Sequence, residues 1–244
     1  MPISGEGWLA VADAARNNAA WCDAVCSTHG GPGELRDSHW MTRAATPPSY
    51  PNLVTLEPAV EPAMAAIREL ERARPGASWA LKDSFGVLPL EGLGFRLLFG
   101  AEWIARGARA GRTSGGRWRR IDAEAALAAW EEAWGESRGR ARVFLPALLW
   151  RSEVAILASV GSDGAIHAGV IANRSENAVG LSNFFARGDE RAAHRAGSID
   201  AATAAFPDLP LVGYESGRDL AEAKALGFAS IGPLRIWAAR PPSQ

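Results

Sequence analysis

The sequence predicts an α+β fold, in which helices cover a mixed, mostly antiparallel sheet. Two observations carry this prediction. Short runs rich in Val, Ile, Leu and aromatic residues alternate with Ala-rich amphipathic stretches along the 244 residues. In the second half, three strand-like runs follow one another with only turn signals between them, which is typical of antiparallel hairpins.

The first half is expected to contain two helices and four strands. Asn18 is a suitable N-cap for the first helix, and the Gly and Pro residues at 30–33 end it. The second helix carries Pro62 in its first turn, which a helix tolerates. The predicted helices lie at 16–31 and 61–74, and the predicted strands at 39–44, 52–57, 78–84 and 93–106.

The second half is expected to alternate strands and helices around the three hairpin strands. Asp122 is a suitable cap for the first of its helices. The polar stretch 187–197 is interpreted as a loop, and the helix after it is expected to begin at Ser198. The predicted strands lie at 117–121, 153–160, 165–173, 178–186, 209–216 and 229–237, and the predicted helices at 122–136, 198–206 and 219–226.

Two features predict a division of the chain. The Gly- and Arg-rich stretch 107–116 has no large apolar residue and is interpreted as a linker between domains at 1–106 and 117–244. In addition, Leu-Gly-Phe occurs at 93–95 and again at 226–228, each time after a strand, an acidic residue and a serine. This agreement suggests a duplication with a partial first copy, although Leu-Gly-Phe is also a common helix stop.

Composition excludes several classes of function. The formal net charge of −1 gives no field that would attract nucleic acid or an anionic membrane. No apolar run is long enough to span a membrane, and residues 1–18 lack the pattern of a signal peptide, so a cytoplasmic location is expected. Cys22 and Cys26 are expected to be reduced thiols; a zinc site with His29 and His39 is the alternative, at a spacing unusual for zinc.

The order of elements in 117–240, closing on "DLAEAKALGFASIGPLRIW", resembles the GNAT superfamily of CoA-dependent N-acyltransferases. The matching points are a closing helix that stops at Gly-Phe, the strand after it, and a central strand followed by a loop and a helix. The resemblance covers about the second half of the chain. The segments "LPLVGYE" and "GPLRIW" are also similar to uncharacterised bacterial proteins.

The resemblance implies an acyl-CoA site after the central strand. In that family the strand lends backbone groups to the pantetheine arm, and a Gly-rich loop with the next helix N-terminus holds the pyrophosphate. No stretch here has two glycines at the family spacing, and the alternative is a solvated loop that leads to an N-cap at Ser198. The candidate CoA-binding residues are Asn183, Phe184, Phe185, Ala186, Arg187, Gly188, Arg195, Gly197 and Ser198.

The catalytic residues implied by the resemblance are only partly present. The family often has an Asn after the fifth strand and a Tyr four residues before the closing Gly, which protonates the leaving thiolate. These positions fall on Ser216 and Ala223, and alanine cannot act as an acid. Tyr214 could replace the acid, and Glu215 could act as a base if burial raised its pKa. The alternative is that Tyr214 packs in the sheet while Glu215 pairs with Arg218 or Arg235.

Two functions follow as hypotheses. The first is an N-acyltransferase that uses acetyl-CoA or another acyl-CoA, with a small-molecule or peptide amine as acceptor. The second is a non-catalytic protein of the same fold that binds a ligand or a protein partner. The sequence indicates no catalytic metal, no nucleic acid partner and no particular oligomeric state.

Overall fold

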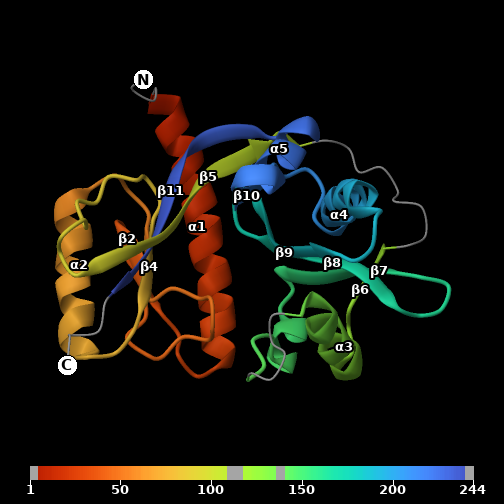
Figure 1. The fold of residues 1–244 in the computed structure, drawn as a ribbon, viewed down its shortest axis with the longest axis horizontal. Coiled ribbons are helices and arrows are strands. Elements are labelled where there is room, and N and C mark those ends of the chain that lie inside the picture. Colours follow the sequence, from red (N-terminus) through yellow and green to blue (C-terminus); the bar gives the residue numbers. More distant parts are fainter. Residues whose placement is uncertain (1–4, 109–117, 136–140, 240–244) are drawn as a thin grey trace.

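The computed structural model, shown in Figure 1, describes residues 5–108, 118–135 and 141–239. In these residues, five α-helices and one 3₁₀ helix pack on a single sheet of eleven strands. The helices are α1 (Gly5–Thr28), α2 (Val60–Ala73), α3 (Glu124–Trp134), η1 (Pro146–Trp150), α4 (Arg191–Ala205) and α5 (Gly217–Ala225). The strands are β1 (Glu34–Leu35), β2 (His39–Met41), β3 (Leu53–Thr55), β4 (Ala80–Asp83), β5 (Phe95–Arg106), β6 (Trp118–Arg120), β7 (Val154–Val160), β8 (Ile166–Arg174), β9 (Val179–Ala186), β10 (Leu211–Glu215) and β11 (Ala229–Ala239).

The predicted fold class is confirmed. The strand order is β1-β2-β3-β4-β11-β5-β10-β9-β8-β7-β6. Within the described residues only β3–β4 and β9–β10 are parallel neighbours, and the other pairs are antiparallel. A helix joins each parallel pair, as parallel strands require. The three hairpin strands of the second half are β7, β8 and β9, as predicted.

The two halves of the chain exchange strands at the centre of the sheet. β4, from the first half, pairs with β11, the last strand. β10, from the second half, pairs with β5. β5 and β11 pair with each other along almost their full length, and Figure 1 shows them side by side between the two halves. Strands from both sides of the predicted linker, 107–116, therefore belong to one continuous sheet. Most of that linker, 109–116, lies outside the described residues.

The repeated Leu-Gly-Phe precedes each of the two exchanged strands. Gly94 and Gly227 both have a left-handed backbone, with φ of 83° and 89°. Gly227 follows the end of α5, where the Phe228 amide donates to the Ala223 carbonyl, so this copy is a helix stop. Gly94 follows a turn instead of a helix. The two Leu-Gly-Phe copies therefore share the left-handed glycine and the position at the start of a strand. Duplication of the two halves stays a prediction.

Helices cover both faces of the sheet. α1 crosses one face over both halves, and α3 packs on the same face beside it. α4 and α5 cover the opposite face of the second half, while α2 covers the first half. Tryptophans fill these layers: the Trp103 indole donates to the Ser84 carbonyl at 2.9 Å and the Trp130 indole to the Leu157 carbonyl at 2.9 Å. No helix among the described residues is long and apolar enough to cross a membrane.

Two predicted helix boundaries are wrong. α1 begins at Gly5 and not at residue 16, because the Ala-rich segment before Arg16 continues the same helix. α4 begins at Arg191 and not at Ser198. The stretch before Ser198 has the polarity of a loop, but Arg195 in it is buried by contacts from elsewhere in the fold. The 3₁₀ helix η1 and the short strand β1 were not predicted.

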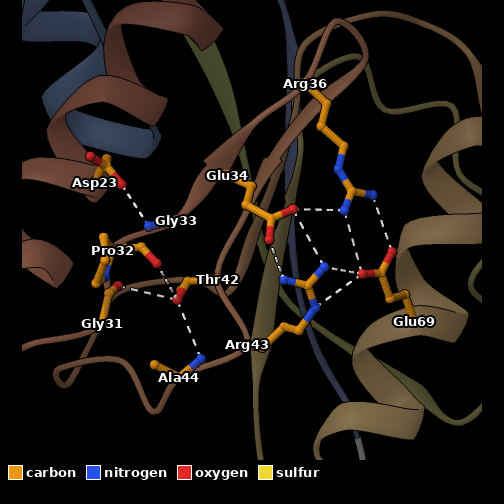
Figure 2. Close-up of polar contacts among 10 residues, drawn as sticks. All are labelled: Asp23, Gly31, Pro32, Gly33, Glu34, Arg36, Thr42, Arg43, Ala44 and Glu69. Carbon is orange, nitrogen blue, oxygen red and sulfur yellow. Dashed lines mark hydrogen bonds and ion pairs between the residues drawn. The ribbon is translucent and has the colours of Figure 1, made fainter.

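An ion-pair network fastens the β1–β2 ribbon to α2 (Figure 2). Arg36 contacts Glu34 at 2.7 Å and Glu69 at 3.1 Å, and Arg43 contacts the same two carboxylates. Hydrogen bonds from Arg43 and Arg36 lower the pKa of Glu34 to about 2. The Asp23 carboxylate forms a second anchor, since it accepts from the Gly33 amide at 2.7 Å. The charges of Arg36, Arg43, Glu34 and Glu69 are thus paired with one another, and we interpret the network as structural.

Candidate functional site

The site begins where two parallel strands separate. β9 and β10 pair at only two positions, Val179 with Leu211 and Gly180 with Val212. Both strands continue beyond this point without further pairing to each other, β9 to Ala186 and β10 to Glu215. β10 also pairs with β5 only over residues 102–106, so residues 95–101 of β5 have an unpaired edge on that side. The separation opens a cleft bounded by free strand edges.

A bulge in β9 shapes one wall of this cleft. The register with β8 shifts between Gly169 and Ile171, opposite Phe185 and Ser182. Asn183 lies inside the bulge and has a left-handed backbone, with φ of 56°, which is uncommon for a residue other than glycine. Bulges redirect side chains and interrupt ladder hydrogen bonds, and they are frequent beside active sites. Here the bulge lies in the part of β9 that is not paired with β10, and Asn183 lines the cleft.

The cleft is part of a cavity of about 780 Å³ that reaches both halves of the chain. At one end it is lined by residues of β9, β10 and α4, among them Asn183 and Arg195. At the other end it is lined by α1, by the loop before β3, and by Lys82 of β4. The walls are rich in aromatic side chains: Trp21, Trp79, Phe99, Trp134, Phe184 and Phe228. This volume is within the range of small-molecule sites.

Tyr214 and Lys82 meet inside this cavity, on the α1 face of the sheet. The Lys82 Nζ lies 3.3 Å from the Tyr214 hydroxyl and 4.7 Å from the centre of its ring. The same ammonium donates to Asn18 Oδ1 at 2.7 Å. Burial lowers the pKa of Lys82, whereas its interactions with Tyr214 and Cys22 raise it, and the net direction is upward.

Glu215 points to the opposite face, because neighbouring strand residues alternate. Its carboxylate forms an ion pair with Arg195 of α4, whose side chain is 8% exposed. Burial raises the pKa of Glu215, and the charge of Arg195 opposes that shift. Arg195 also lies 4.7 Å from the Phe184 ring centre, and Arg191 lies 5.1 Å from it. Glu215 thus pairs with Arg195, and not with Arg218 or Arg235, the partners that the sequence suggested.

The loop from β9 to α4 contains the predicted pair Arg187 and Gly188. Gly188 has a left-handed backbone, with φ of 72°. No side chain caps α4, whose N-cap residue is Glu190, so the first amides of the helix have no partner within it. Arg191 is held by Asp219 at 2.6 Å and by Glu222 at 3.3 Å. A positive helix end therefore faces the loop, with two acidic residues, Asp189 and Glu190, beside it.

Comparisons with known proteins show the fold at low sequence identity. A GCN5-related N-acetyltransferase from Kribbella flavida is 12% identical with a TM-score of 0.60, over 95% of this chain and 96% of that one. A putative GNAT-family acetyltransferase from Novosphingobium aromaticivorans is 13% identical with a TM-score of 0.54, over 94% and 99%. The chain has a divergent GNAT fold. No family model matches the sequence, and no curated protein matches it.

A third solved structure widens the range of activities found on this GNAT fold. The N-myristoyltransferase of Saccharomyces cerevisiae, with bound myristoyl-CoA, is 10% identical with a TM-score of 0.53, over 90% of this chain and 72% of that one. Other structural neighbours are of unknown function, such as a conserved protein from Staphylococcus epidermidis at 10% identity and a TM-score of 0.53, over 86% of this chain and 94% of that one. The fold is therefore acyltransferase-like, and the similarity reaches no further than the fold.

The predicted CoA-binding residues of this GNAT-fold chain divide into two groups. Asn183, Phe184, Arg195 and Ser198 line the cavity. The others do not line it: Phe185, Ala186, Arg187, Gly188 and Gly197. Among these, the Phe185 ring is in the core on the other side of β9, 5.1 Å from the Trp130 ring.

The expected helix start at Gly197 and Ser198 is corrected. Both residues lie inside α4, where amides already serve the helix. The Ser198 hydroxyl donates to the Arg195 carbonyl at 2.7 Å. A side chain at Gly197 would come within 2.4 Å of the Trp118 indole nitrogen, so this glycine allows helix α4 to pack closely on β6. A phosphate site at a helix N-terminus has to be sought at Arg191.

The two positions at which GNAT proteins often carry Asn and Tyr have structural roles here. Ala223 lies in α5, is 1% exposed and faces the core between α5 and the sheet. Ser216 is the N-cap residue of α5 and makes no side-chain capping hydrogen bond. The proton donor, if the chain has one, therefore has to come from another element.

The cysteines and histidines form no metal site in the part of the chain that the structure describes. Cys22 and Cys26 are free and buried. Burial raises the pKa of Cys22, and it raises the pKa of Cys26 to about 12, so neither is an activated thiolate. His29 contacts the Val143 carbonyl at 2.9 Å, away from either thiol.

Lys82 is the site residue that sequence reasoning missed. The chain has only two lysines, Lys82 and Lys224, among its 26 basic residues. A lysine inside a predicted strand, between Leu81 and Asp83, in a protein that otherwise uses arginine, was a signal that could have identified it. Its partners Asn18 and Tyr214 lie 64 and 132 residues away in sequence, and no local pattern indicates them.

Proposed function

We propose that this protein is an acyl-CoA-dependent N-acyltransferase whose thioester lies in the cleft between β9 and β10. The observation that carries the proposal is the open cleft itself, bounded by the bulge at Asn183 and continuous with a cavity that contains Tyr214. Structural neighbours with this fold include acetyltransferases and an N-myristoyltransferase with bound myristoyl-CoA, which supports an acyl-CoA at family level.

The strand edges account for binding of the acyl donor. Beyond Gly180, no described strand pairs with β9 on its β10 side, so we assign the amides and carbonyls of this edge to the pantetheine arm. The buried Ser182 hydroxyl makes no hydrogen bond among the described residues and lines the same wall. The uncapped N-terminus of α4 follows directly, where partnerless amides and the helix dipole favour phosphate. Asp189 and Glu190 act against a phosphate at this position.

Tyr214 is the group best placed to handle the leaving thiolate. In acyl transfer the amine nitrogen bonds to the thioester carbonyl carbon, the C–S bond breaks, and the thiolate takes up a proton. The Tyr214 hydroxyl lines the cavity, and Lys82 stands beside it at 3.3 Å. The tyrosine therefore acts as the general acid in this proposal.

The acceptor amine also loses a proton during the reaction. Glu215 lines the cavity as well, but its carboxylate is engaged by Arg195. An ion-paired carboxylate is a weaker base than a free one, since the cation stabilises its charged form. We therefore assign the proton to water in the cavity, with Glu215 as the second choice. The acceptor enters from the end of the cavity that α1 and the loop before β3 enclose.

A second candidate function is a non-catalytic protein of the same fold that binds a ligand. The specific observation in its favour is Ala223, which occupies the position of the usual acid and is buried in the core. In that case Tyr214 and Lys82 would bind a ligand without transferring a group. Binding of acyl-CoA alone does not separate the two functions, whereas release of free CoA does.

The test combines binding and turnover. Calorimetric titrations with acetyl-CoA, octanoyl-CoA and myristoyl-CoA come first, and a ligand at a hundred times its dissociation constant stabilises the fold by about 2.7 kcal/mol. Thiol release is then followed with a panel of amines. Binding with amine-dependent thiol release supports the enzyme, and binding without it supports the non-catalytic function. Absence of binding by every CoA ester contradicts the acyltransferase and leaves only a protein that binds another ligand or a protein partner.

A further inference from the structure

The inner end of the cavity holds a buried cation without a carboxylate partner. Lys82 is 6% exposed, and no acidic side chain lies within ion-pair distance of its ammonium in the described parts of the chain. Its contacts are neutral groups, Asn18 Oδ1 at 2.7 Å and the Tyr214 hydroxyl at 3.3 Å. A buried charge is costly unless it is paired, so this ammonium lacks the partner that burial normally requires.

A second polar group of the same cavity also lacks a partner. Tyr50 is 8% exposed, and its hydroxyl makes no hydrogen bond of normal geometry among the described residues, although the Trp21 indole stands beside it. Burial, followed by the neighbouring Cys22 and Tyr214, raises the pKa of Tyr50 well above its usual value. The hydroxyl is therefore a neutral donor at physiological pH.

Helix α1 brings these groups to one place. Asn18, Trp21 and Cys22 are spaced by three and four residues, so they share one face of the helix. Lys82 meets that face through Asn18, and Tyr50 meets it through Trp21. The position of Tyr50 is fixed by its own loop, because its amide donates to the Pro47 carbonyl at 3.1 Å and its carbonyl accepts from Thr46 at 2.8 Å.

We infer that Lys82 and Tyr50 form a carboxylate-binding site, and that the acceptor of the proposed acyl transfer is an amine that also carries a carboxylate. The ammonium supplies charge and a donor to one oxygen, and the Tyr50 hydroxyl supplies a donor to the other. The aromatic walls of the cavity favour an apolar side chain on the same molecule, so the ligand class is an apolar amino acid. The acceptor role rests on the proposed function, whereas the carboxylate site does not.

The probes are N-acetyl-L-phenylalanine, which has the form of a product, and its carboxamide, N-acetyl-L-phenylalaninamide. They differ only in the group that the site is inferred to bind. Calorimetry is expected to give an affinity for the acid that is at least about tenfold higher than for the amide, because a hydrogen bond to a charged group is worth more than a neutral one. Decanoate is titrated in the same way. If it binds more tightly than N-acetyl-L-phenylalanine, the carboxylate ligand is a fatty acid and not an amino acid.

Three variants locate the site. Lys82→Met keeps the length of the side chain and is expected to remove the preference for the acid, whereas Lys224→Met, at the other lysine, is expected to keep it. Tyr50→Phe is expected to weaken acid binding about fivefold with little loss of stability, since the hydroxyl makes no hydrogen bond of normal geometry in the described parts of the chain. If Lys82→Met does not fold, Tyr50→Phe alone decides.

Equal binding of acid and amide, no binding of any carboxylate, or an unchanged preference in both Lys82→Met and Tyr50→Phe overturns the inference. Titration with acetyl-CoA is run on the same samples. Binding of acetyl-CoA without binding of the acid leaves the proposed function standing and removes the carboxylate site. If the protein binds the acid but binds no acyl-CoA, the carboxylate site stands and the proposed acyltransferase function is removed.

Discussion

Lys82 of β4 and Tyr214 of β10 meet at 3.3 Å across 132 residues of sequence. β11 and β5 lie between their strands in the sheet, so the contact spans the two exchanged strands. The pair depends on both halves of the chain, and neither half could form it alone. A cation and a phenol thus stand together in a cavity that opens to the cleft between β9 and β10.

The first prediction concerns proton donation by Tyr214. Tyr214→Phe keeps the ring, which packs edge-on against Trp103 with 5.5 Å between centres, and removes only the hydroxyl. If that hydroxyl protonates the thiolate, kcat for amine-dependent thiol release falls by about 100-fold or more, while the dissociation constant for acyl-CoA stays the same. An unchanged kcat in a variant that binds acyl-CoA assigns the proton to another group.

The second prediction concerns the ion pair of Arg195 and Glu215. Removing one partner leaves the other half-buried and unpaired, so Arg195→Met and Glu215→Leu are each expected to lower the free energy of unfolding by about 2 kcal/mol. The double variant is expected to lose less than the sum of the two. Urea denaturation measures all four proteins. Additive losses mean that the two side chains do not stabilise each other.

The third prediction concerns the contact of α4 with β6. Gly197→Ala improves helix propensity but places a methyl group 2.4 Å from the Trp118 indole nitrogen. Overpacking costs about 1–3 kcal/mol, so the net change is a destabilisation of about 1 kcal/mol. In a Trp118→Ala background the same substitution is expected to be neutral or stabilising. Stabilisation by Gly197→Ala in the wild type contradicts the close approach.

The fourth prediction concerns pH and the network of Figure 2. Arg43 and Arg36 lower the pKa of Glu34 from 4.5 to about 2 in the folded state. A lowered pKa contributes stability above the unfolded value, and that contribution is lost as the pH falls from about 4.5 towards 2.

Glu34→Gln is therefore expected to lower the melting temperature at pH 6 and to have a smaller effect at pH 3. Because the groups are exposed, 1 M salt should also reduce the difference. Glu57→Gln, outside the network, serves as the control. A difference between wild type and Glu34→Gln that grows on acidification contradicts the sign of the shift.

The sequence predicted the positions of helices and strands better than it predicted which strands and side chains contact one another. Apolar alternation and turn residues are local, so β7, β8 and β9 could be placed from the chain alone. The start of α4 could not, because Arg195 has the polarity of a loop residue until Glu215 and Phe184 are known to surround it. The pairing of β5 with β11 joins residues far apart in the sequence, and no local pattern predicts it. The repeated Leu-Gly-Phe indicated only that these two strands begin in a similar way.

The candidate site was predicted in part for the same reason. Asn183 and Phe184 lie at the cleft as expected from the order of the elements. Gly197 was assigned from the resemblance to a family, which cannot distinguish a glycine that binds phosphate from one that admits a tryptophan ring. The rarity of lysine marks Lys82 in the sequence, but its role and that of Tyr50 become clear only when their contacts in the folded chain are known.

The central claim is that an acyl-CoA binds in the cleft between β9 and β10 with its phosphates at the start of α4. Calorimetric titration of acetyl-CoA into Ala192→Glu and Ala125→Glu tests it most directly. Each alanine is exposed and is the second residue of its helix, α4 or α3, so the two substitutions have matched effects on helix stability. The account predicts that Ala192→Glu weakens binding by about tenfold or more through repulsion of the phosphates, while Ala125→Glu binds like the wild type. Equal affinity in both variants, or no binding to the wild type, contradicts it.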